Sequence, residues 1–111
     1  MSPPLVPWMT RIDRLILEVL DDAEIAAIPP KAIVFELRTR HGIDAPSESH
    51  VNRRLRNELT KHGLVDQPFA DEARGYYGIT ELGERYFHDP GAEPKEFVAD
   101  TDGIYGEERP D

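Results

Sequence analysis

One short segment of this chain concentrates side chains that can recognise a nucleic acid. Its members are Arg53, Arg54, Arg56 and Asn57. A guanidinium group can pair bidentately with guanine, an asparagine amide can pair with adenine, and neighbouring arginines can hold phosphates. The residue types and their close spacing therefore point to contacts with the grooves and the backbone of DNA.

A helix over about residues 48–62 must position these side chains. Ser47 precedes it as an N-cap, and Gly63 stands where a left-handed residue ends a helix. Its apolar residues recur every four positions and mark the core side: Val51, Leu55 and Leu59. The sequence therefore predicts an amphipathic helix whose polar side remains in solvent.

That polar side is made of hydrogen-bonding and cationic groups. At about 100° per residue, Arg53 and Asn57 lie opposite the apolar side. Arg54 and Arg56 lie on the two flanks. The polar residues beside the first pair are Ser49, His50 and Thr60. A solvated basic face that serves only solubility is the alternative, but arginines clustered in an acidic chain favour DNA recognition.

The charge of the chain is negative and unevenly distributed. The 111 residues include 13 Lys+Arg and 22 Asp+Glu, which gives a formal net charge of −9. Residues 1–88 carry a net −3 and residues 89–111 a net −6, so the body can hold a local basic face. Only three of the basic residues are lysine. An acid-rich, lysine-poor composition is typical of salt-loaded cytoplasm and predicts a halophilic protein; an ordinary acidic protein is the alternative.

Several classes of site are disfavoured by the residue types present. The chain has no cysteine, which excludes a disulfide, a thiol nucleophile and a zinc site with thiolate ligands. The four histidines are scattered without metal-binding spacing. Serines at a helix start are far more often caps than nucleophiles. We therefore expect no enzymatic activity, no metal and no cofactor.

The hydropathy pattern predicts a soluble cytoplasmic protein without membrane contact. No apolar run approaches the roughly 18 residues of a membrane span. The first residues lack the basic and apolar regions of a secretion signal.

The chain divides into an arm, a body and a tail. Residues 1–10 are proline-rich and form an extended N-terminal arm, and residues 11–88 form the body. Residues 89–111 are an acidic tail, expected to be disordered or loosely docked, whose removal should leave folding nearly unchanged. The tail residues able to dock on the body or on a dimer mate are Phe97, Ile104 and Tyr105.

Two further helices precede the arginine-bearing one. The first covers about residues 11–21, where Thr10 and Asp13 form a partial capping box. The second runs from Pro30, which suits a first helical position, to about Thr39.

A hairpin and a short helix complete the body. Residues 64–67 and 76–79 are β-like and flank a polar loop. Thr80 then caps a short fourth helix. The order helix, helix, helix, hairpin, helix is that of a winged helix-turn-helix.

Two stretches carry a resemblance to known proteins. Residues 49–65, which end in Gly63-Leu64-Val65, resemble the recognition helix and first wing strand of winged-helix transcriptional regulators. Residues 74–83 are similar to their second wing strand and following helix. With the Trp8-Met9-Thr10 start, the chain most resembles the small repressor-like winged-helix proteins of halophilic archaea and their phages. The resemblance implies an α+β fold: three helices, a two-stranded wing hairpin and a short C-terminal helix, here followed by an acidic tail.

The resemblance also implies binding to double-stranded DNA. The predicted function is a sequence-specific transcriptional regulator, a repressor, that reads the major groove with helix 48–62. The candidate DNA-contacting residues are Ser49, His50, Arg53, Arg54, Arg56, Asn57, Thr60 and Arg74. One recognition helix reads too few base pairs for genomic specificity, so we expect a homodimer on two half-sites.

The wing departs from the family pattern. Asp71 and Glu72 stand close to Arg74, so this arginine contacts either a phosphate or one of these two carboxylates. The acidic wing and the net charge of −9 favour the alternative function, a winged-helix protein–protein interaction module without DNA binding.

Overall fold

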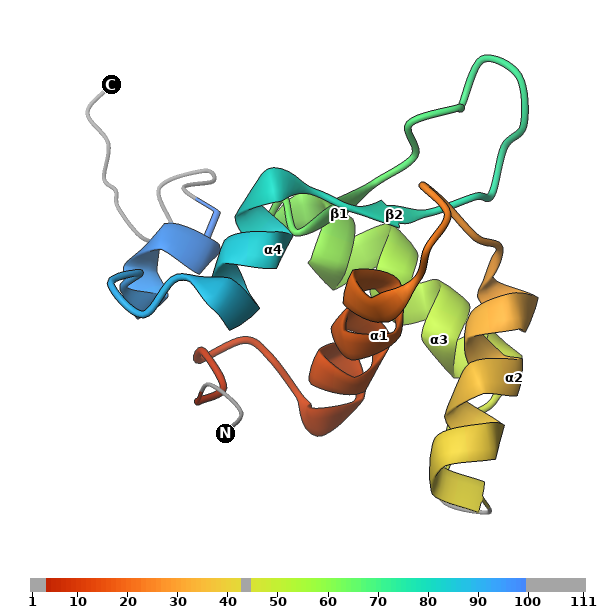
Figure 1. Cartoon of the computed structure of the whole chain (residues 1–111), viewed down its shortest axis with the longest axis horizontal. Coiled ribbons are helices and arrows are strands. Elements are labelled where there is room, and N and C mark those ends of the chain that lie inside the picture. Colours follow the sequence, from red (N-terminus) through yellow and green to blue (C-terminus); the bar gives the residue numbers. More distant parts are fainter. Residues whose placement is uncertain (1–3, 43–44, 100–111) are drawn as a thin grey trace.

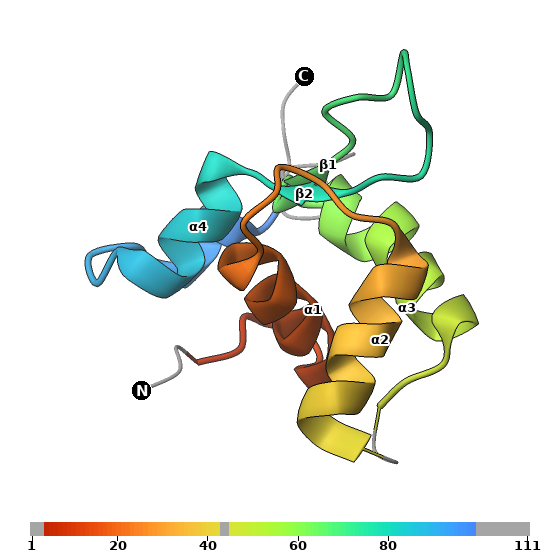
Figure 2. The same ribbon diagram turned by 45° about the vertical axis from the view of Figure 1, so that its right-hand side comes forward.

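The computed structural model describes residues 4–42 and 45–99. The first helical elements are α1 (Arg11–Asp22), α2 (Pro30–His41) and α3 (Glu48–Arg54), which η2 (Leu55–Leu59) continues. The later elements are β1 (Val65–Asp66), β2 (Gly78–Ile79), α4 (Glu81–His88) and η3 (Pro94–Phe97). In both views α1 lies between α4 and α2, and the hairpin lies across one end of the helices (Figure 1, Figure 2). The described residues thus form a small α+β fold that is compatible with the expected winged helix-turn-helix.

The first two helices follow from local signals. The Thr10 side chain accepts from the backbone of Asp13, and the Asp13 side chain accepts from the backbone of Thr10, so the predicted capping box is complete. Pro30 occupies a first helical position of α2, and Gly42 ends that helix with a φ of 64°. Each boundary lies within two residues of its prediction. The fully buried side chains of these helices form the centre of the core: Ile16, Leu17, Ile33 and Leu37.

The arginine-bearing segment is helical from residue 48 to 61, which confirms the predicted helix, but residues 55–59 depart from the expected regular α-helix. The Ser47 side chain caps α3 by accepting from the His50 amide at 3.1 Å. From Leu55 to Leu59 the backbone widens into a π-helix. The Thr60 hydroxyl donates to the Leu55 carbonyl at 2.6 Å, which satisfies an acceptor in the widened turn. The local apolar pattern did not reveal this turn, because Leu55 and Leu59 stay on the core side in either geometry.

The hairpin is shorter than predicted and gains a third backbone segment. β1 and β2 pair antiparallel, with Val65 opposite Ile79. Ile28, in the α1–α2 connection, forms an antiparallel bridge with Tyr77 through two hydrogen bonds of 2.9 Å. Glycine is required at position 78, because a Cβ there would lie 2.3 Å from the carbonyl oxygen of Ala26. A bridge of one residue pair requires no alternation of apolar and polar residues along the chain. The sequence therefore does not predict the pairing of Ile28 with Tyr77.

The first part of the tail is docked on the body. Residues 94–97 form η3, and the Phe97 side chain is buried. The Trp8 indole N–H donates to the Phe97 carbonyl at 2.8 Å. The Ala99 amide donates to Nδ1 of His62 at 2.7 Å. Of the two expectations for the tail, docking is therefore the observed one for residues 89–99.

The N-terminal arm is also packed instead of simply extended. Val6 and Met9 are buried, and the Met9 amide donates to the Val6 carbonyl at 2.9 Å. Two further parts of the predictions, the docking of Ile104 and of Tyr105, lie outside the described residues.

Candidate nucleic-acid interface

The exposed side of α3 and η2 gathers most of the predicted contact residues. The exposed members are Ser49, Arg53, Arg56, Asn57 and Thr60. His50, in the first turn of α3, is half-buried. The opposite side of the segment is fully buried through Val51, Leu55 and Leu59. The sequence therefore located this polar face correctly.

The arginines of this face are available to a ligand. Within residues 4–42 and 45–99, neither Arg53 nor Arg56 forms an ion pair with a carboxylate. Arg56 lies close enough to Tyr77 for its charge to favour the ionised phenol, although burial still raises the pKa of Tyr77. Guanidinium groups of this kind offer hydrogen-bond donors and positive charge to anionic or hydrogen-bond-accepting partners.

Arg54 is engaged within the protein. Its Nε donates to Oδ1 of Asp13 at 2.8 Å, and its Nη2 donates to Oδ2 at 2.6 Å. Asp13 is completely buried, and the hydrogen bond with it raises the pKa of the Arg54 guanidinium. The expectation that Arg54 holds a phosphate from the flank of the helix is therefore corrected, because the guanidinium fork is already occupied.

The sequence does not predict that Asp13 pairs with Arg54. The sequence identifies Asp13 only as half of a capping box. The spacing does carry a signal of this pairing, because Asp13 lies on the same helical face as the apolar Ile16 and Leu17, three and four residues later. An acidic residue in that position has to be paired once it is buried.

Thr60 retains acceptor capacity. Its hydroxyl hydrogen is directed to the Leu55 carbonyl, so the oxygen can still accept from a partner.

The loop between β1 and β2 presents Arg74 separately from the helix face. The loop is held by turns, and the Gly75 amide donates to Oε1 of Gln67 at 2.8 Å. It extends away from the helices (Figure 1). Arg74, Asp71 and Glu72 are all exposed. In the described part of the chain Arg74 has no ion-pair partner, so the pairing with Asp71 or Glu72 is not observed.

The chain is similar in sequence to a phage repressor. No protein-family model matches the chain, and no solved structure matches it. The chain is 38% identical over 85 residues to the repressor protein of Halobacterium phage phiH, which covers 73% of this chain and 81% of that protein. The chain belongs to the family of this phage repressor.

Among the described residues no helix is long and apolar enough to cross a membrane.

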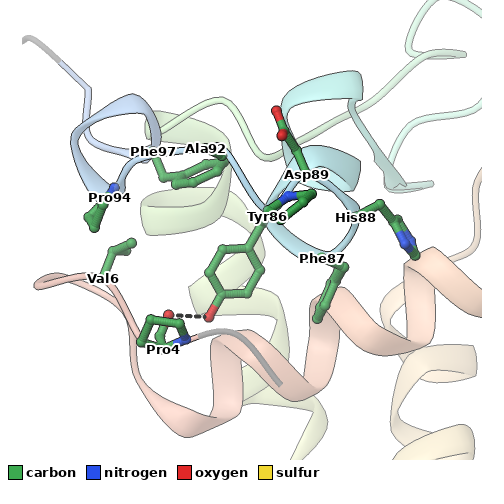
Figure 3. A pocket seen from close by; sticks show the side chains of 10 residues that line it. Pro4, Val6, Tyr86, Phe87, His88, Asp89, Ala92, Pro94 and Phe97 are labelled. Carbon is green, nitrogen blue, oxygen red and sulfur yellow. Dashed lines mark hydrogen bonds between the residues drawn. The ribbon is translucent and has the colours of Figure 1, made fainter. Parts of the chain in front are cut away.

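This member of the phiH repressor family also has a pocket away from the arginine face. It measures about 340 Å³ and lies between the N-terminal arm, α4 and the docked part of the tail (Figure 3). The Tyr86 hydroxyl on its wall donates to the Pro4 carbonyl at 2.8 Å. The Gly91 amide and the Arg85 guanidinium bind the Asp89 carboxylate at its rim and lower the pKa of Asp89. The polar groups of the pocket thus serve to join the terminal segments to α4.

Proposed function

We propose that the protein is a sequence-specific DNA-binding repressor of the winged helix-turn-helix class, and that α3 with η2 enters the major groove. The observation that carries this proposal is the exposed face with Arg53 and Arg56, neither paired with a carboxylate among the described residues, in a chain of net charge −9. Membership in the phage repressor family supports it. A local cluster of positive charge on an acidic chain attracts an anionic partner to that face.

The residues of the face divide by the chemistry that they offer. Arg53 and Asn57, opposite the buried side, are placed to read base edges. Arg56 and Arg74 are placed to bind phosphates, the second from the wing. Ser49 and His50 lie in the first turn of α3, where recognition helices approach the bases. The remaining residue, Thr60, accepts from a donor on the DNA.

The proposed active form is a homodimer in a salt-loaded cytoplasm. A second copy supplies the second half-site that specific recognition in a genome requires. The phage relative comes from a host genus of halophiles, and the lysine-poor, acidic composition of this chain fits the same environment.

Selection of bound double-stranded DNA by the full chain in molar potassium chloride tests the proposal. We expect enrichment of one sequence with two related halves, and loss of that enrichment for Arg53→Ala. Lys95→Ala is the matched control, since it removes one exposed positive charge from η3. Failure of the full chain to enrich any sequence contradicts the proposal.

A protein-interaction module is the second candidate function. The observation that favours it is the wing, where Phe69 is 43% exposed beside the acidic Asp71 and Glu72. An exposed aromatic ring on a loop that also carries two carboxylates suits a protein partner better than a phosphate backbone. In that case DNA selection gives no enriched sequence, while substitution of Phe69 abolishes capture of the partner.

A further inference from the structure

The Asp13 carboxylate connects the start of α1 to α3 and η2, which together (residues 48–59) are the proposed recognition segment. Its Oδ2 accepts from the Thr10 amide at 2.9 Å, from the Thr10 hydroxyl at 3.2 Å and from Nη2 of Arg54 at 2.6 Å. Its Oδ1 accepts from Nε of Arg54 at 2.8 Å. The carboxylate is fully buried, and all four hydrogen bonds come from two residues. One side chain therefore both caps α1 and holds α3.

The contacts on the two sides of α3 differ in directionality. Val51 and Leu55 pack into the core through apolar contacts, which favour burial without fixing one angle. The two parallel hydrogen bonds of a guanidinium fork require a defined orientation of both partners. The Asp13–Arg54 pair is therefore the contact best suited to fix the rotation of α3 about its own axis.

Arg54 also lies next to the residues placed to read bases. It follows Arg53 directly and precedes Asn57 by less than one helical turn. α3 and η2 are continuous, so a rotation of this segment that moves Arg54 also moves both of these side chains. We infer that Asp13 and Arg54 are positioning residues, which set the rotation of the recognition helix and thereby the base selectivity of the site. This inference rests on the proposed function.

Burial shields the ion pair between Asp13 and Arg54 from screening by salt. The Arg54 side chain is 21% exposed and that of Asp13 is 0% exposed. The pair between Arg40 and Asp22 is, by contrast, 31% and 60% exposed. Molar salt screens an exposed pair far more than a buried one. The rotation of α3 is therefore maintained at salt concentrations where surface ion pairs contribute little.

Three variants test the inference against a direct phosphate contact by Arg54. Arg54→Lys keeps the charge and loses the fork, and Asp13→Asn keeps the shape and loses the charge. The double variant Asp13→Leu/Arg54→Met replaces the pair with apolar side chains, a change that buried pairs often tolerate. Arg11→Lys is the matched control, because Arg11 is an exposed arginine of α1. Circular dichroism establishes that each variant is folded under the assay conditions.

The readout is the ratio of affinities for the selected DNA site and a scrambled duplex. We expect all three variants to lower this ratio at least tenfold, with the control unchanged. We also expect the dependence of nonspecific affinity on salt to stay as in the wild type. If Arg54 instead binds phosphate, Arg54→Lys keeps the ratio and Asp13→Asn raises affinity for every duplex. Full selectivity in the folded double variant overturns the inference.

A measurement without DNA separates this inference from the proposed function. Residual dipolar couplings report the orientation of α3 relative to α1 in solution. We expect Arg54→Lys and the double variant to change that orientation while α1 and α2 keep theirs. An unchanged orientation overturns the inference even if the protein binds DNA. If the wild type selects no DNA, the proposed function fails, and the couplings still decide the role of the pair.

Discussion

Trp8 and His62 stack face to face, with ring centroids 4.2 Å apart and planes 11° from parallel. Nδ1 of His62 accepts from the Ala99 amide, so the ring proton lies on Nε2, which faces Glu58 at 3.4 Å. The Trp8 indole donates to the Phe97 carbonyl. These contacts join the N-terminal arm, the turn that follows η2 and the docked part of the tail.

Stability should fall when His62 becomes protonated. Burial lowers the pKa of His62, while Glu58 and Asp13 favour the charged form and Lys61 opposes it. The unfolded chain therefore binds a proton more readily than the folded one. The stabilising contribution is complete above a pH of about 6.5, the unfolded value, and is lost as pH falls through the folded pKa.

Chemical unfolding between pH 8 and pH 5 measures this effect. The slope due to His62 cannot exceed about 1.4 kcal/mol per pH unit, the value for one proton. His62→Phe keeps a ring for Trp8 but removes both the titration and the acceptor for Ala99. We expect a less stable variant whose stability depends less on pH in this window. An identical pH slope in variant and wild type would show that His62 is not the responsible group.

Arg53 and Arg56, the exposed arginines of the recognition segment, should behave differently. Arg53→Ala should weaken specific binding by roughly 1–3 kcal/mol and relax the preference at one base position. Arg56→Ala should weaken binding to all sequences alike, because phosphate contacts carry no sequence information. Fluorescence anisotropy with the selected site and its single-base variants distinguishes these outcomes. Unchanged site preference in Arg53→Ala means that Arg53 does not read a base.

Two truncations should separate the docked tail from the residues that follow it. Removal of residues 89–111 eliminates the buried Phe97 ring, whose burial contributes about 1.5–3 kcal/mol, together with the partners of Trp8 and His62. We therefore expect a clear decrease in Tm, contrary to what composition alone indicates. Removal of residues 100–111 should leave Tm nearly unchanged.

The shorter truncation should also raise DNA affinity at low salt. Residues 100–111 contain five acidic residues and one basic residue, and their repulsion of DNA weakens as salt increases. Equal Tm values for the two truncated proteins would contradict the structural role of residues 89–99.

DNA binding should depend only weakly on salt. Counterion release scales with the number of phosphate contacts. Arg54 and Arg40 are paired with carboxylates of the protein, so we do not expect them to contact phosphates. Salt also screens the repulsion between DNA and a chain of net charge −9. We expect specific binding to persist at molar potassium salt and the fold to loosen at low salt.

Affinity for the selected site, titrated from about 0.1 M salt upward, checks this expectation, with circular dichroism as the measure of folding. Tight binding and full folding only at low salt would falsify the halophilic interpretation.

The sequence alone determined the order of the elements and the polar side of the recognition segment. Caps such as Thr10 and Ser47, and the spacing of Val51, Leu55 and Leu59, act within a few residues of one another. Local signals of this kind are readable without a fold.

Only the tertiary structure decided which of the three arginines is engaged within the protein. Arg53, Arg54 and Arg56 are chemically identical, and Arg54 differs because it meets a buried carboxylate 41 residues away in the chain. The docking of Phe97 beside Trp8, 89 residues apart, is decided in the same way. Such pairs depend on where the packed helices place residues that are distant in sequence, and no local pattern specifies that distance.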